Sequence, residues 1–256
     1  MISLLDTRLA QLKRTDEVVH TITPSELNAG EWWAETGRDW PGHLSSGLIE
    51  PRKGYRFRPE NLALSVILDG VECERLVDLG TGSGALLLIA DAFLEPSIGL
   101  GLELQSDAVE RLGRTLEAHQ RGHLRAEQGD LREDKSLRTL VSTLGGKADV
   151  VVMNPPFFPS GWGRASSLES VHRSTHALHG DVFAFLEAAK AIVSDEGMIF
   201  VVFDATRMAS LFAAAGKVVL EPDRIVMIPN RHQAARADEP YRVWVRFRQG
   251  SMLRSL

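Results

Sequence analysis

The feature that most constrains this chain is a strand-turn-helix pattern in residues 75–85, Arg-Leu-Val-Asp-Leu-Gly-Thr-Gly-Ser-Gly-Ala. An apolar strand ends there in a glycine-rich turn, and an apolar helix over residues 85–93 follows directly. Gly80, Gly82 and Gly84 carry no Cβ, so the backbone can pass close to a bound ligand. A helix that begins at such a turn also presents free N–H groups. The pattern therefore predicts a ligand-binding site at the carboxyl end of this strand.

Acidic residues follow the next two predicted strands. Glu103 ends the strand over residues 97–102, about 20 residues past the turn, where nucleotide-binding α/β folds place a carboxylate that binds ribose. Asp130 comes after the strand over residues 124–128. The glycine spacing is Gly-x-Gly-x-Gly and not the Gly-x-Gly-x-x-Gly of dinucleotide-binding proteins, so a nicotinamide cofactor is disfavoured.

Strands and helices alternate strictly from residue 75 onward. Helices are predicted over residues 107–119 and 131–144 and from residue 182, with Ser106 as the N-cap of the first of these. Further strands are predicted over residues 148–153, 197–203, 217–228 and 241–248. This alternation indicates a parallel sheet with helices on both faces. Ligands of such open sheets bind beyond the carboxyl ends of the strands, where the glycine turn and both acids fall.

Together, Asp78-Leu-Gly-Thr-Gly, Glu103 and Asp130 resemble the cofactor site of class I S-adenosylmethionine-dependent methyltransferases. The resemblance implies an α/β, Rossmann-like fold with a seven-stranded, mostly parallel sheet and an antiparallel last strand. It also implies that the glycine loop lies against the methionine part of the cofactor, that Glu103 accepts the ribose hydroxyls and that Asp130 contacts the adenine amine. The expected cofactor-binding residues are Tyr55, Phe57, Asp78, Gly80, Thr81, Gly82, Gly84, Glu103, Leu104, Asp130, Leu131 and Asn154.

Residues 154–157, Asn-Pro-Pro-Phe, end the fourth predicted strand and indicate the chemistry. The nitrogen of a ring amine is a poor nucleophile because its lone pair is delocalised into the ring. The Asn154 side-chain oxygen and the Pro155 carbonyl can accept both N–H protons and so free the lone pair. Two consecutive prolines hold this backbone rigid, and Phe157 can stack on a planar target. The expected catalytic residues are Asn154, Pro155, Pro156 and Phe157, with no metal ion.

Residues 54–57, Gly-Tyr-Arg-Phe, are similar to a segment of the tRNA adenine-N6 methyltransferases that act beside the anticodon. The resemblance implies that this segment covers the cofactor and helps to form the target pocket. The predicted function is therefore methyl transfer from S-adenosylmethionine to the N6 amine of an adenine in RNA, with tRNA as the favoured partner. The residues expected to bind substrate are Arg56, Phe158, Arg173 and His176.

Two other enzymatic functions share parts of this pattern and are the second and third hypotheses. The Asn-Pro-Pro motif also occurs in guanine-N2 methyltransferases of ribosomal RNA and in glutamine-N5 methyltransferases of release factors. The glutamine enzymes usually carry Asn-Pro-Pro-Tyr and a separate N-terminal helical domain, whereas position 157 here is Phe. A fourth hypothesis is an inactive module that binds the cofactor or RNA without turnover.

Composition bounds the remaining alternatives. A chain of 256 residues with 44% hydrophobic content can bury one sizeable core, and we expect an N-terminal extension over residues 1–50 followed by a methyltransferase domain over residues 51–256. No apolar run approaches the roughly 20 residues of a membrane-spanning helix, and the first residues lack the pattern of a secretory signal. One cysteine, Cys73, excludes an internal disulfide. We therefore expect a cytoplasmic protein.

The net charge of −5 is unevenly distributed. From residue 224 onward the chain has seven arginines and no lysine against two acids, and residues 52–58 hold a second basic cluster. Such clusters can bind phosphate on a protein that is acidic as a whole. The histidines at 172, 176 and 179 have helical spacing but no acidic residue close by to complete a metal site, so no metal is expected.

Overall fold

The computed structural model describes residues 27–29, 31–34, 47–51, 59–155, 182–228 and 242–250. The strands in these ranges are β1 (Glu31–Ala34), β2 (Leu48–Pro51), β3 (Arg75–Leu79), β4 (Ile98–Glu103), β5 (Leu124–Gln128), β6 (Ala148–Met153), β7 (Val193–Asp204), β8 (Leu220–Ile228) and β9 (Arg242–Gln249). The helices are α2 (Leu64–Ile67), α3 (Ala85–Leu94), α4 (Ser106–Ala118), α5 (Asp134–Leu144), α7 (Val182–Ile192) and α8 (Met208–Lys217), with the 3-10 helices η3 (Pro59–Ala63) and η4 (Ala205–Arg207).

The main sheet has seven strands in the order β5-β4-β3-β6-β7-β9-β8. The pairs from β5 to β7 are parallel, and β9 runs antiparallel to both β7 and β8. The chain therefore starts the sheet with β3, next to the central strand β6, builds outward to β5, and then crosses to β6 and the other half. This confirms the predicted seven-stranded sheet with an antiparallel last strand.

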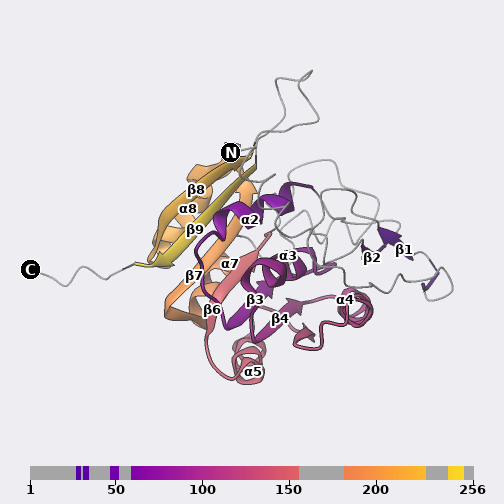
Figure 1. The fold of residues 1–256 in the computed structure, drawn as a ribbon. Coiled ribbons are helices and arrows are strands. Elements are labelled where there is room, and N and C mark those ends of the chain that lie inside the picture. The colour runs from indigo at the N-terminus through magenta and orange to yellow at the C-terminus, as the bar shows by residue number, and fades with distance from the viewer. Residues whose placement is uncertain are drawn as a thin grey trace, which may run out of the picture.

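Helices cover both faces of this sheet, as Figure 1 shows. The apolar residues of β3 and β6 alternate between the faces: Leu76 and Val150 belong to the cluster that contains α2, α3 and α4, whereas Val77 and Val151 belong to the cluster that contains α5, α7 and α8. A strand that is buried on both faces needs apolar residues in succession. This explains the apolar run over residues 150–153 of β6.

The structure adds a small antiparallel hairpin, β1 and β2, that the sequence did not predict. The hairpin lies on the α4 side of the molecule, far from β8 (Figure 1). Arg114 of α4 donates to both carboxylate oxygens of the buried Glu31, and the Ile49 amide donates to the Thr115 hydroxyl at 3.2 Å. Neither Glu-Trp-Trp-Ala in β1 nor Leu-Ile-Glu-Pro in β2 alternates apolar and polar residues, so the sequence shows no period of two. The division into an extension and a domain at residue 50 stays a prediction.

Several predicted boundaries were wrong by a few residues. Helix α5 begins at Asp134 and not at residue 131, because residues 130–133 form a turn closed by the Glu133 amide and the Asp130 carbonyl at 3.0 Å. Strand β8 begins at Leu220 and not at residue 217, because α8 continues to Lys217. Among the helices of the described residues, none has the length and apolar character needed to cross a membrane.

The turn between α8 and β8 contains a strained residue. Val219 has a φ of 56° and its side chain is exposed. A β-branched residue is unfavourable in this left-handed region because its Cβ crowds the following carbonyl.

We expect Val219→Gly to raise the free energy of unfolding by about 0.5–1 kcal/mol, since the strain exceeds the entropy that glycine adds to the unfolded chain. Chemical denaturation of wild type and variant measures this difference. The control is Ile225→Gly, also exposed but in the regular strand β8, which should lower the stability by about 0.5–1 kcal/mol. Destabilisation by both substitutions would contradict the assignment of strain to Val219.

Candidate functional site

The strand register brings the predicted site residues to one edge of the sheet. Leu79, the last residue of β3, pairs with Leu102 of β4 on one side and with Met153 of β6 on the other. Glu103 ends β4 and Asn154 follows β6 directly, so both lie at the level where the glycine turn begins. Glu103 pairs in turn with Gln128, the last residue of β5. The prediction that these motifs meet at the carboxyl ends of adjacent strands is confirmed.

The glycine loop is bound to the end of β4 by backbone hydrogen bonds. The amides of Gly80 and Thr81 both donate to the Leu102 carbonyl, at 2.8 and 3.1 Å. The amide of Gly82 donates to Glu103 Oε2 at 3.0 Å. The loop therefore takes its position from the neighbouring strand, and one carboxylate oxygen of Glu103 takes part in holding it.

The three glycines of this loop have different surroundings. A Cβ on Gly84 would overlap Leu112 of α4, and a Cβ on Gly80 would lie 3.0 Å from the Phe185 ring of α7. A Cβ on Gly82 would meet no described atom within 4 Å. All three have positive φ. The approach of a ligand to all three glycines stays a prediction; the structure adds that Gly80 and Gly84 also permit close packing, whereas no described atom crowds Gly82.

Asp78 lies under this loop and is buried. Its Oδ2 accepts hydrogen bonds from the Thr81 hydroxyl at 2.7 Å and from the Leu87 amide at 3.2 Å. Its Oδ1 is buried and has no hydrogen-bond partner among the described residues. The pKa of Asp78 is raised to about 7, chiefly by burial; the two hydrogen bonds oppose this shift, and the nearby charge of Glu103 adds to it. A positively charged group above the loop would stabilise the ionised form.

Glu103 is nearly buried and held by two backbone amides. Besides Gly82 on Oε2, the Gln105 amide donates to Oε1 at 3.0 Å. Each carboxylate oxygen can accept two hydrogen bonds, so both retain capacity for a hydroxyl group. The Gln105 contact also corrects the predicted cap of α4. Gln105 occupies the N-cap position, Ser106 is the first helical residue, and no side chain caps the helix.

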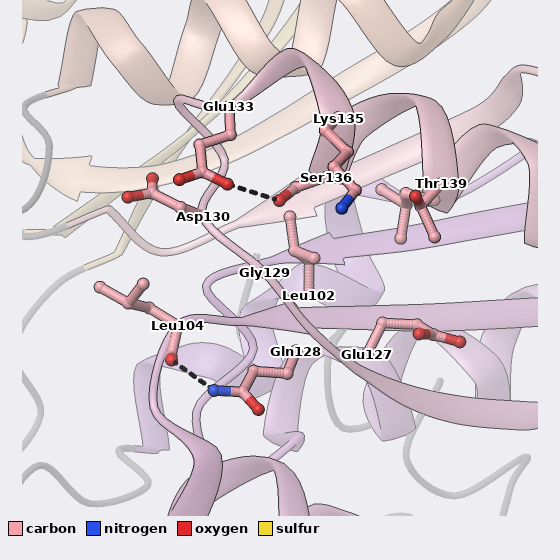
Figure 2. Close-up of a pocket in the computed structure, with 11 residues that line it drawn as sticks. Leu102, Leu104, Glu127, Gln128, Gly129, Asp130, Glu133, Lys135, Ser136 and Thr139 are labelled. Carbon is pink, nitrogen blue, oxygen red and sulfur yellow. Dashed lines mark hydrogen bonds between the residues drawn. The ribbon is translucent and has the colours of Figure 1, made fainter.

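A hollow of about 420 Å³ lies between the ends of β4 and β5 and the start of α5 (Figure 2). Its lining includes Leu104 and Asp130, two of the residues predicted to contact the cofactor. Leu104 is partly exposed, as expected of an apolar side chain that covers a ring. Leu131, which was also predicted to contact the cofactor, packs against the apolar core that contains Leu140. The carboxylate of Asp130 is bound by Arg132, a contact that the sequence analysis did not anticipate.

Asn154 and Pro155 are the catalytic candidates within the described residues. The Asn154 side-chain oxygen and the Pro155 residue are buried at the carboxyl end of β6. The sequence analysis missed one supporting residue at this edge, Gly101 of β4. A Cβ on Gly101 would lie 2.8 Å from the Thr81 side chain, so glycine makes room for Thr81. The alternation Gly99-Leu-Gly101-Leu within β4 could have indicated that one face of this strand needs glycine. The other predicted site residues lie outside the described residues: Tyr55, Arg56, Phe57, Pro156, Phe157, Phe158, Arg173 and His176.

Comparison with known proteins gives low identities over most of the chain. A release factor glutamine methyltransferase from Haemophilus influenzae is 26% identical over 183 residues, which cover 67% of this chain and 53% of that protein. A tRNA1(Val) (adenine(37)-N6)-methyltransferase from Vibrio vulnificus is 26% identical over 171 residues, which cover 60% of this chain and 66% of that protein. The chain thus spans about half the length of the first relative. No family model matches the chain.

The crystal structure of TrmN from Thermus thermophilus is similar with a TM-score of 0.52 and 18% identity, covering 74% of this chain and 48% of that one. At this identity the likeness concerns the fold. The chain has the Rossmann-like fold and the strand-end arrangement of the class I methyltransferases, as the resemblance in its sequence predicted. In sequence it is similar to tRNA adenine-N6 methyltransferases and to glutamine methyltransferases.

The described residues fit S-adenosylmethionine, the cofactor of this class. The buried Asp78 Oδ1 can accept from an ammonium group, Glu103 can accept ribose hydroxyls, and the open space at Gly82 admits the ligand close to the backbone. In the described part of the chain, no group of three or more histidine, cysteine, aspartate and glutamate side chains could hold a metal ion. The three histidines considered from sequence lie outside that part.

Asp78→Asn should separate the stability of the fold from affinity for the cofactor. The pKa of Asp78 in the folded protein lies above the unfolded value, so its ionisation destabilises the fold as the pH rises through about 7. Relative to wild type, we expect the free energy of unfolding of the variant to be higher at pH 8 than at pH 5 by about 2–3 kcal/mol. Chemical denaturation at both pH values tests this.

The same variant should bind S-adenosylhomocysteine about tenfold more weakly at pH 8, because a neutral amide replaces a carboxylate opposite an ammonium group. Titration calorimetry measures the affinity. The control is Asp134→Asn on the exposed start of α5. It should change neither the difference in stability between pH 5 and pH 8 nor the affinity for S-adenosylhomocysteine. Unchanged affinity in Asp78→Asn would remove this carboxylate from the site.

Proposed function

We propose that this protein is a cytoplasmic enzyme that transfers a methyl group from S-adenosylmethionine to the N6 amine of an adenine in RNA, most readily in tRNA. One observation carries the proposal: the register of β3 and β6 places Asn154 beside the glycine loop at the same edge of the sheet. The acceptor of the methyl group and the residues that hold its donor would then be neighbours. Proximity of this kind supplies a large part of the rate enhancement of two-substrate reactions.

The residues of this chain would act on the amine by accepting its protons. Asn154 offers a side-chain oxygen, and the Pro155 backbone offers a carbonyl whose direction is limited by the proline ring. Hydrogen bonds to both N–H groups favour a pyramidal nitrogen with an available lone pair. Dipoles that are already fixed before the reaction stabilise the developing positive charge at no further reorganisation cost. S-adenosylmethionine, when bound, supplies an electrophilic methyl group.

The basic clusters of the sequence support a nucleic acid as substrate. Asp78, Glu103 and Asp130 lie on the β3–β5 side, where a cofactor with a sulfonium and an ammonium group would bind. On the β7–β9 side, Arg207 ends η4 and Arg242 begins β9, where Asp204 pairs with Arg242 at 3.3 Å and neutralises it. Support for a polyanion such as RNA therefore comes from the basic residues of positions 52–58 and of the chain from residue 224 onward.

A glutamine amide in a protein is the second candidate substrate. The relative from Haemophilus influenzae is named as a release factor glutamine methyltransferase, and its identity with this chain equals that of the tRNA enzyme. An amide nitrogen is planar and poorly nucleophilic like a ring amine, so Asn154 and Pro155 could serve either target.

Methylation of natural substrates tests the proposal. The purified protein is incubated with labelled S-adenosylmethionine and with total tRNA, ribosomal RNA or cell protein from a strain that lacks the gene. We expect label in tRNA, recovered as N6-methyladenosine after digestion to nucleosides. Label in guanosine of ribosomal RNA or in glutamine would overturn the proposed target while keeping the chemistry. Cofactor binding without label in any fraction would favour a binding module without turnover.

Asn154→Ala should lower kcat by about 10²-fold or more, because it removes a polar contact to the transition state. The affinity for S-adenosylhomocysteine should stay within about threefold of wild type, since the residues that bind the cofactor are unchanged. Single-turnover kinetics and calorimetry give the two values. Activity within a few-fold of wild type would contradict the role given to Asn154.

A further inference from the structure

The carboxylate of Asp130 is occupied by a residue of its own loop. The Arg132 guanidinium donates through Nε to Oδ1 at 2.9 Å and to Oδ2 at 3.2 Å, and through Nη2 to Oδ2. The Arg132 amide also donates to Oδ1 at 2.9 Å. The pairing raises the pKa of Arg132, and no other acid in the described β3–β5 edge is bound by an arginine side chain in this forked manner.

These contacts use the acceptor capacity of the carboxylate. Two oxygens offer about four positions for hydrogen-bond donors, and three N–H groups of Arg132 take up most of them through four contacts, with Nε–H shared between the two oxygens. An amine that approached Asp130 would therefore have to displace the guanidinium. The same carboxylate lines the hollow beside Leu104 (Figure 2), on the side where the adenine of the cofactor is expected.

We propose that Arg132 competes with the adenine amine for Asp130 and thereby weakens the binding of both cofactor and product. The inference rests on the proposed use of S-adenosylmethionine but not on which substrate accepts the methyl group. Arg132 is a positioning residue: it sets how much of the Asp130 carboxylate is available to the ligand.

The surroundings of Arg132 keep the free-energy cost of its displacement from Asp130 low. The Arg132 side chain is 43% exposed, whereas that of Asp130 is 16% exposed. The released guanidinium can turn into solvent, and Glu133, whose charge already acts on it, offers a second carboxylate. An ion pair with one partner this exposed contributes little to stability because water competes for both groups. Displacement by a ligand therefore needs only a small share of the binding free energy.

Binding of S-adenosylhomocysteine to Arg132→Met tests the proposal, since methionine keeps the apolar stem and removes the guanidinium. We expect the Kd to fall about two- to fivefold, the range set by a partly exposed ion pair. A second ligand is the analogue of S-adenosylhomocysteine with purine in place of adenine, which lacks the amine. Its Kd should change by less than about twofold.

Two comparisons separate competition at Asp130 from a general effect. Arg138→Met removes another exposed arginine that pairs with an aspartate, Asp134, on α5 at 3.7 Å, and it should leave both Kd values unchanged. In an Asp130→Ala background, Arg132→Met should no longer improve binding, because the contested carboxylate is gone.

The outcomes are distinct. Weaker or equal binding of S-adenosylhomocysteine by Arg132→Met overturns the inference and would indicate that the guanidinium contacts the ligand itself. Improvement that persists without Asp130 also overturns it. Failure of every variant and of wild type to bind S-adenosylhomocysteine overturns the proposed function together with the inference. Methylation of glutamine in place of adenine leaves the inference standing.

Discussion

The site depends on the docking of the glycine loop onto the end of β4. Three successive amides, from Gly80 to Gly82, donate to the Leu102 carbonyl and the Glu103 carboxylate. This contact joins the loop that would hold the methionine part of the cofactor to the acid that would hold its ribose. Because Glu103 is restrained by the loop and by the Gln105 amide, it is in position before a ligand arrives. The entropy of ordering these groups is then lost during folding and not during binding.

The same arrangement buries the carboxyl group of Asp78 at a position that does not favour the stability of the fold. Asp78 is buried below the loop, and burial raises its pKa to about 7. An uncompensated carboxylate in the interior is unfavourable unless a ligand or a hydrogen-bond donor meets it. Thr81 and Leu87 supply donors to one oxygen only. A stability disadvantage in the free protein that a cationic ligand removes is characteristic of a binding site.

The two halves of the carboxyl edge differ in the charges that they present. Acids on β3, β4 and the loop after β5 face the side assigned to the cofactor, and arginines flank the end of β7 and the start of β9. Asn154 lies between them through the pairing of β6 with β3 and β7. On the acidic side, Arg132 is proposed to compete with the cofactor for the Asp130 carboxylate, which lowers the affinity for the cofactor and eases its release. These features together connect the sheet order to the proposed transfer from a bound cofactor to its acceptor.

The sequence by itself determined the alternation of strands and helices, the parallel sheet, and the positions of Asp78, Glu103, Asp130 and Asn154 at strand ends, because periodicity and glycine turns are local properties. Only the tertiary structure decided what these residues touch. That Gly84 accommodates Leu112, that Glu103 accepts from Gly82, and that Arg132 occupies Asp130 follow from strand register and helix packing, which join residues far apart in the chain. The β1–β2 hairpin is of the same kind, since the contacts that join it to α4, Arg114 with Glu31 and Thr115 with Ile49, link residues far apart in the chain.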